Sequence, residues 1–135
     1  MIKETIKFVD YEGEDRTQIA YFNLTKVELM RLSAKYAPKS VDLEAVTKII
    51  VDRGDVGEML SFIEDMILSA YGERDNDGVR FVKNPRIRAE FENSLAYAQL
   101  FEDLLGDDGN RIQTFAKGLY SDNSAKKPLA QAPRG

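Results

Sequence analysis

The sequence predicts a mainly α-helical protein with an N-terminal β-hairpin, an α+β fold in which about five or six helices form a compact bundle. Two alternating polar and apolar segments fill residues 2–22, and helix-start signals recur after them. A broad helical apolar face over residues 56–71 supplies a central core element. The chain has 135 residues. We therefore expect one domain over residues 1–120 and a tail over residues 121–135.

The hairpin is expected over residues 2–22. Residues 2–11 alternate apolar with charged side chains, which indicates a half-buried strand. Residues 12–15 form a turn, and residues 17–22 are typical of a returning strand. A lone hairpin is only marginally stable in water. We therefore expect this one to pack on helices or to pair with another copy or a partner.

Three helices should follow the hairpin. Thr25 and Glu28 form a capping box, and the helix that they open should end near Tyr36. A second helix is expected over residues 41–51, ending before Gly54.

The third helix should begin after Asp55, again with a glutamate three residues later at Glu58. We expect Gly72 to end it in a left-handed C-terminal cap. Its apolar face is wide enough for contact on two sides, so it should be the central core helix. The face contains Val56, Met59, Leu60, Phe62, Ile63, Met66, Ile67, Ala70 and Tyr71.

Three more helices complete the predicted bundle. Asn84-Pro85 marks a helix start with proline at the first helical position. Ser94 should cap a fifth helix that ends at Gly106, and Asp107 or Asp108 should open a short sixth one. Residues 121–135 hold one large apolar residue and two prolines. They bury too little apolar surface to offset the entropy of ordering, so we expect them to be disordered.

Composition argues against an enzyme. The chain contains neither cysteine nor histidine, which excludes disulfides, thiolate zinc sites and histidine-based triads. Residues 73–84 depart from a calcium-binding loop because its twelfth position is Asn84 instead of a bidentate glutamate. We expect no catalytic residues, no metal and no cofactor.

Charge and hydropathy bound the partners and the compartment. The net charge of −4 and the pI of about 5.0 argue against nucleic-acid binding. No segment approaches the ~20 apolar residues that span a bilayer, and the N-terminus does not resemble a signal peptide. We therefore expect a cytoplasmic protein that binds no membrane.

The candidate binding residues are basic and aromatic, and they lie near the middle of the chain. Basic side chains cluster around Phe81, which favours a charge-complementary protein surface, with solubility as the alternative. The cluster consists of Arg74, Arg80, Lys83, Arg86 and Arg88. The aromatic residues belong mostly to the core, but some of them have the spacing that a groove for a partner helix would require. The candidate partner-binding residues are Tyr71, Arg74, Arg80, Phe81, Phe91, Tyr97 and Phe101.

Five segments in a fixed order resemble one family. They are Tyr21–Met30, Ile67–Arg74, Asp77–Lys83, Phe91–Phe101 and Phe115–Leu119. Over residues 2 to about 120 the chain resembles the tail assembly chaperones of long-tailed, non-contractile bacteriophages, of the type found in phages of Gram-positive hosts. The most specific part is the combination Tyr-Gly-x-Arg and Asp-Gly-x-Arg-Phe-x-Lys. The chain departs from the family at Ser94–Tyr97, where members carry Thr-Glu-Ala-Tyr, and in a longer segment over residues 33–56.

The resemblance implies a non-enzymatic, mainly helical protein that binds the tape measure protein. It would keep that long apolar helical chain soluble in the host cell cytoplasm until tail tube subunits polymerise around it, and would be absent from the mature virion. Contact with the tail tube protein and homo-oligomerisation stay open. A structural minor tail component and a small phage regulatory protein are the alternative functions.

Overall fold

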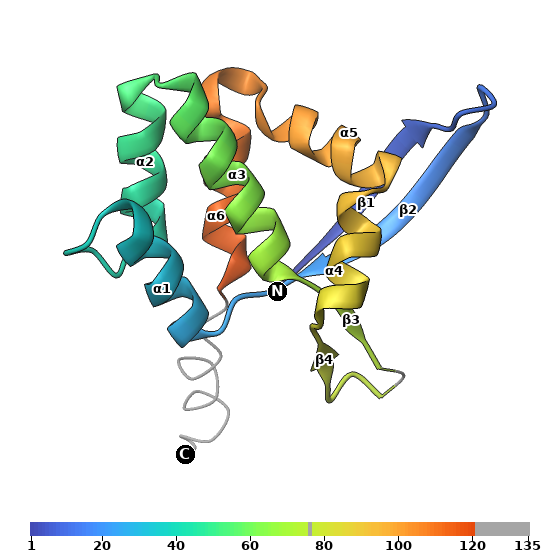
Figure 1. Cartoon of the computed structure of the whole chain (residues 1–135), viewed down its shortest axis with the longest axis horizontal. Coiled ribbons are helices and arrows are strands. Elements are labelled where there is room, and N and C mark those ends of the chain that lie inside the picture. The colour runs from blue at the N-terminus through green and yellow to red at the C-terminus, as the bar shows by residue number, and fades with distance from the viewer. Residues whose placement is uncertain (76, 121–135) are drawn as a thin grey trace, which may run out of the picture.

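The computed structural model describes residues 1–75 and 77–120, and the predicted tail at 121–135 lies outside the described residues (Figure 1). Within those residues the fold is mainly α-helical with one antiparallel sheet, as the sequence predicts. The helices are α1 (Lys26–Tyr36), α2 (Leu43–Arg53), α3 (Val56–Ala70), α4 (Pro85–Glu92), α5 (Leu95–Leu104) and α6 (Asn110–Leu119), with the short 3-10 turn η1 at Asp107–Gly109. The strands are β1 (Ile2–Val9), β2 (Asp15–Phe22), β3 (Tyr71–Arg74) and β4 (Phe81–Val82).

The sheet has the order β1-β2-β3-β4, and every neighbouring pair is antiparallel. The first two strands form the predicted hairpin, whose far end extends past the helices (Figure 1). The short strands β3 and β4 were not predicted. They add a second hairpin that joins the first where Tyr21 pairs with Gly72 and Phe22 with Tyr71.

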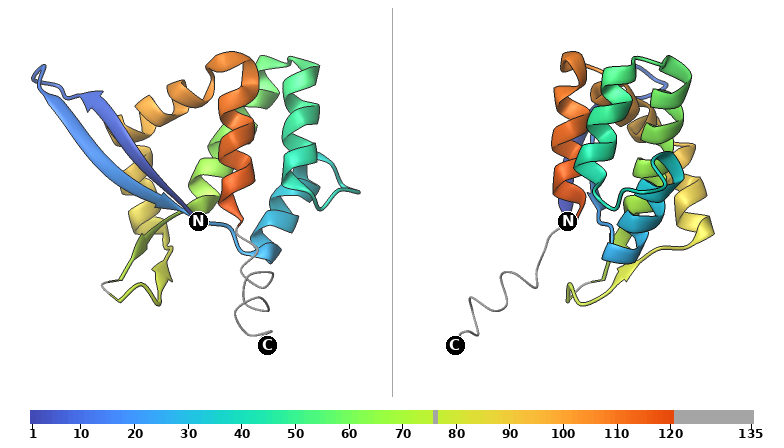
Figure 2. Two further views of the ribbon diagram at one scale, coloured as in Figure 1. Left: turned by 180° about the vertical axis from the view of Figure 1, so that it is seen from behind. Right: turned by 90° about the vertical axis from the view of Figure 1, so that its left-hand side faces the viewer.

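The helices pack beside and behind this sheet. Helix α3 contacts α1, α2, α5 and α6, which confirms it as the central core helix. Figure 2 shows α6 beside α2, and α5 lies against β1. Phe62 and Ile63 of α3 are fully buried, together with Phe22 of β2. None of the helices in the described range is both long and apolar enough to cross a membrane.

Four predicted helix starts, at Thr25, Asp55, Asn84 and Ser94, are confirmed by their capping bonds. The Thr25 amide donates to Glu28 Oε1 (2.9 Å) while the Glu28 amide donates to Thr25 Oγ1 (3.2 Å). Asp55, Asn84 and Ser94 each accept a hydrogen bond from the amide three residues later. Helix α2 begins at Leu43, two residues later than predicted, because Asp42 accepts from the Glu44 amide and so sets the start.

Two predicted boundaries are wrong. Gly72 is not a left-handed cap, because α3 ends at Ala70 and the chain continues as strand β3. A Cβ on Gly72 would lie 2.6 Å from the Phe81 ring and 2.8 Å from the Val82 carbonyl oxygen, so close packing requires glycine there.

The second wrong boundary is the start of α6. Asp107 and Asp108 do not open this helix, since both have positive φ and form η1. Helix α6 starts at Asn110, after Gly109.

Candidate functional site

The two faces of the sheet divide the candidate residues. Side chains alternate along a strand, so the register fixes the face on which each one lies. Phe22 and its partner Tyr71 face the helices, whereas Tyr21 and its partner Gly72 face away from them. We call the second side the outer face. It carries Lys3, Thr5, Lys7, Val9, Asp15, Thr17, Ile19, Tyr21, Arg74 and Phe81.

On the helix side, aromatic rings form a continuous ladder between the sheet and α4, α5 and α6. Phe22 contacts the rings of Tyr71, Phe91 and Phe115 at centroid distances of 5.8, 5.8 and 5.3 Å. The Tyr71 and Phe91 rings stack at 4.0 Å. The ladder consists of Phe22, Tyr71, Phe91, Tyr97, Phe101 and Phe115.

Four candidate residues belong to this ladder. Phe91 is buried, while Tyr71, Tyr97 and Phe101 are half-buried. Burial, with the nearby carboxylate of Glu64, raises the pKa of Tyr97 to about 12, so its hydroxyl is neutral at physiological pH. These residues join the sheet to the helices, and only the half-buried rings reach the surface.

The remaining candidates, Arg74, Arg80 and Phe81, lie in or beside the β3–β4 hairpin. The guanidinium of Arg74 lies 5.1 Å from the centroid of the Tyr21 ring, an arrangement that favours a cation–π contact. Phe81 packs its ring over Gly72 on the same face. Arg80 is exposed at the turn, where its amide donates to the Asp75 carboxylate.

The outer face is positively charged within an acidic protein. Lys3, Lys7 and Arg74 are exposed there, against the single carboxylate of Asp15. Within residues 1–75 and 77–120, none of these three cations takes part in an ion pair. Since the whole chain carries −4, this face is where a negatively charged partner segment would be attracted.

Lys83 does not belong to the basic surface in which its sequence position placed it. Its ammonium donates to the carbonyl oxygens of Asn23 (2.7 Å) and Ser69 (2.8 Å) and to Glu28 Oε1 (2.8 Å). The side chain is 16% exposed. It ties the second hairpin to the start of α1 and the end of α3, so its role is structural.

The rest of the family-like motif also serves the fold. The Asp77 carboxylate accepts from the Val79 amide (3.0 Å), and Gly78 has a positive φ of 73°. Together they form the polar turn of the second hairpin. Asp77, Gly78 and Lys83 of the motif therefore build and anchor β3–β4, whereas Arg74 and Arg80 are exposed.

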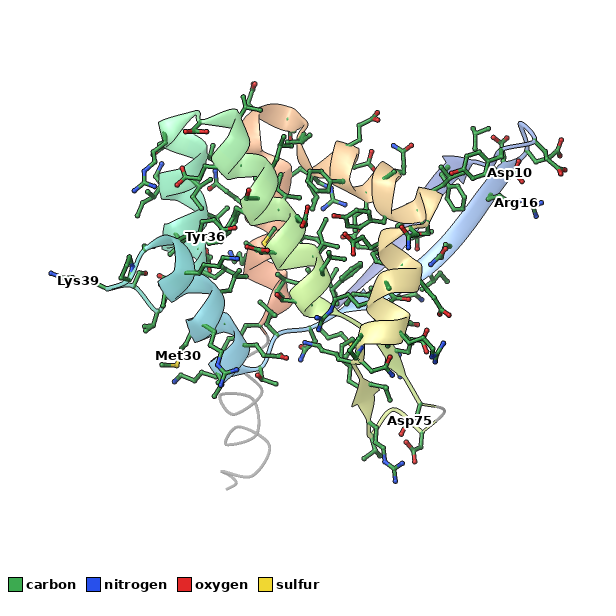
Figure 3. The ribbon with its side chains drawn as sticks, viewed as in Figure 1. Asp10, Arg16, Met30, Tyr36, Lys39 and Asp75 are labelled. Atoms are coloured by element: carbon green, nitrogen blue, oxygen red, sulfur yellow. The ribbon has the colours of Figure 1, made fainter. Side chains whose placement is uncertain are left out.

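A notch between β2 and β3 was not apparent from the sequence. It has a volume of about 400 Å³ and is lined by residues 18–21 and 71–74. It opens because the two hairpins diverge, as the positions of Asp10 and Asp75 at their far ends show (Figure 3). A smaller hollow of about 230 Å³ lies between α1, α2 and α6 around Leu29, Val41 and Tyr120.

A comparison of the sequence with known families found a match. The family model described as phage tail assembly chaperone matches residues 1–131. The chain belongs to the phage tail assembly chaperone family. No curated protein and no solved structure matches it.

Family membership confirms the predicted resemblance at the level of the family and implies a non-enzymatic role for this chaperone. The narrower assignment to non-contractile tails and Gram-positive hosts stays a prediction.

Proposed function

We propose that this chaperone binds the tape measure protein and keeps it soluble in the host cell cytoplasm while the phage tail assembles. The observation that carries the proposal is the family match over residues 1–131. The protein leaves before the virion matures, since its task ends when tail tube subunits cover the tape measure protein.

The charge distribution supports this role. A net charge of −4 favours solubility of a complex that carries a long apolar chain. The outer face supplies a contact surface of opposite sign, on which Ile19 is 50% exposed beside Tyr21 and Arg74. Apolar contact and charge attraction are thereby available in one place.

Co-expression tests the proposal. With this chain present, the tape measure protein of the same phage should move into the soluble fraction and co-purify with the chaperone. Arg74→Ala should lower the recovered complex, whereas Lys48→Ala, an exposed cation on α2, should leave it unchanged. A tape measure protein that is equally insoluble with and without the chaperone would contradict the proposal.

Analysis of purified particles separates this function from its alternatives. Absence of the chain from mature virions agrees with a chaperone, while its stoichiometric presence would identify a structural minor tail component. A small regulatory protein would leave the solubility of the tape measure protein unaffected.

A further inference from the structure

Within residues 1–75 and 77–120, the edge of β2 that faces the notch has backbone groups that pair with no strand. We propose that this edge receives an extended, acidic segment of the tape measure protein as an added β-strand. The identity of the partner rests on the proposed function, while the mode of binding rests on the geometry of β2.

The hydrogen-bonding pattern of the first hairpin shows which groups point outward. The Asp10 amide donates to the Glu14 carbonyl (2.9 Å), so Asp10 directs its N–H toward the returning strand, as a residue of a bonded pair does. Bonded and non-bonded pairs alternate in an antiparallel ladder. The register then makes Ile6–Gln18 and Glu4–Ala20 bonded pairs. Thr17 and Ile19 consequently direct their N–H and C=O groups away from β1.

The hydrogen bond between the end of β2 and the end of α3 leads to the same assignment of outward-pointing groups. The Asn23 amide donates to the Ala70 carbonyl (2.9 Å), so odd-numbered residues of this segment bond toward β3. Tyr21 continues that series through its pairing with Gly72. Thr17 and Ile19 are the next two positions along the same edge.

Strand β3 turns away before it reaches those positions. Its next two residues, Glu73 and Arg74, pair with β4 instead. Among the described residues, no strand pairs with Thr17 or Ile19 on this side, and the notch of about 400 Å³ is lined by Ile19 and begins one residue after Thr17. Thr17 is exposed and Ile19 is 50% exposed, so a strand has access to both.

The edge lacks the features that normally prevent strand addition. Exposed edges usually carry lysine, proline or a bulge. The outer-face positions of β1 include Lys3 and Lys7, whereas β2 presents the uncharged sequence Thr-Gln-Ile-Ala over residues 17–20. This difference within one hairpin favours β2 as the edge that accepts a partner.

The positive charge of the outer face favours an acidic segment as the strand that pairs with the edge of β2 that faces the notch. A strand bonded to Thr17 and Ile19 places alternate side chains on the outer face, which also carries Lys7 and Arg74. Acidic side chains at those positions are attracted, and binding should weaken as ionic strength rises. A second copy paired through its own β2 would bring the same cations to the same face, which like-charge repulsion disfavours.

Two threonines provide a matched test. Thr17 and Thr5 are both exposed on the outer face, but their outward N–H groups lie on opposite edges of the hairpin. Proline removes that N–H without breaking a β1–β2 bond. With the full chain co-expressed with the tape measure protein, Thr17→Pro should reduce the co-purified complex at least fivefold, while Thr5→Pro should retain it. Equal recovery with both variants would overturn the strand proposal and leave the proposed function intact.

Amide hydrogen exchange supplies a readout that needs no variant. With overlapping synthetic peptides of the tape measure protein, the Thr17 and Ile19 amides should become protected, while those of Thr5 and Lys7 stay unprotected. Protection at neither pair in a bound complex would overturn the proposal. A Thr17→Pro-sensitive dimer of the chain alone, seen by light scattering, would assign the edge to self-association instead. Failure of the wild type to bind the tape measure protein would overturn the proposed function and the partner named here together.

Discussion

The first hairpin has eight register pairs between β1 and β2, and apolar side chains on one side of it pack against helices. The second hairpin has two register pairs and depends on Lys83 and Gly72 for its attachment. The first hairpin is therefore held by repeated strand pairing and burial. The second hairpin is held by a few specific contacts that single substitutions can remove.

The recognisable motif and the proposed binding surface overlap only at Arg74 and Phe81, which lie on the outer face, and the difference between the hairpins explains why the overlap is small. A two-pair hairpin needs particular residues at particular positions, so it leaves a distinctive sequence pattern. The outer face of the long hairpin needs only alternation and exposure, which many side chains satisfy. Gly72, Gly78 and Lys83 of the motif are thus anchors of the fold, and most of the candidate contact surface has a weaker signature.

The largest expected effect comes from the aromatic residue that joins the first hairpin to the helices. Phe22 is fully buried among the rings of Tyr71, Phe91 and Phe115. Phe22→Ala should lower the free energy of unfolding by about 3–5 kcal/mol, measured by denaturant titration. Ile19→Ala, three residues earlier on the outer face, should change it by less than about 1 kcal/mol. Similar losses for the two variants would show that the outer face is also packed.

The anchor of the second hairpin should give the next largest effect. Lys83→Met removes the donor to two backbone carbonyls and leaves the Glu28 carboxylate with the Thr25 amide alone, and should cost about 2–3 kcal/mol. Arg86→Met is the control, because its pair with Glu90 is largely exposed and should contribute less than about 0.5 kcal/mol. Thermal melting of both variants compares them directly. Equal stability would mean that β3–β4 does not depend on the lysine.

Alanine substitutions at two glycines, Gly72 and Gly57, should have opposite effects on the free energy of unfolding. Gly72→Ala forces a Cβ against the Phe81 ring and the Val82 carbonyl, and should destabilise by about 1–3 kcal/mol. Gly57→Ala lies in α3, where the added Cβ would be 3.5 Å from Asp55 Oδ1, an ordinary contact. It should stabilise by up to about 1 kcal/mol through helix propensity. A tolerated alanine at position 72 would contradict the close packing of the second hairpin.

Local signals allowed most of the helices to be predicted. Thr25, Asp55, Asn84 and Ser94 each bond to an amide within the next turn, so the information lies within a few residues. The central role of α3 followed from the width of its apolar face, and Phe62 is fully buried as expected.

The parts that sequence did not predict depend on distant residues. Strands β3 and β4 are too short for alternation to be visible, and Lys83 bonds to residues 55 and 60 positions earlier. Gly72 resembled a helix cap because its reason for being glycine, the ring of Phe81, lies on another strand. Three of the seven candidate binding residues, Tyr71, Arg74 and Phe81, lie on strands, and their faces follow from strand register, which no local pattern specifies.

The smallest expected effect is a pH dependence of stability that arises where α1 contacts the second hairpin. Burial raises the pKa of Glu28, but the hydrogen bonds from Lys83 and the Thr25 amide outweigh it and hold that pKa below the ordinary value of 4.5. A carboxyl with a lowered folded pKa contributes stability that is complete above its unfolded pKa and disappears as the pH falls through the folded pKa. The difference in melting temperature between wild type and Glu28→Gln should therefore be constant near neutral pH and shrink in acid, below about 4.5. The same comparison in a Lys83→Met background isolates the ion pair, and there the pH-dependent part should become smaller. A difference that grows in acid would show that Glu28 is not stabilised in its charged form, and that Lys83 holds the second hairpin through the two carbonyls of Asn23 and Ser69 without the carboxylate.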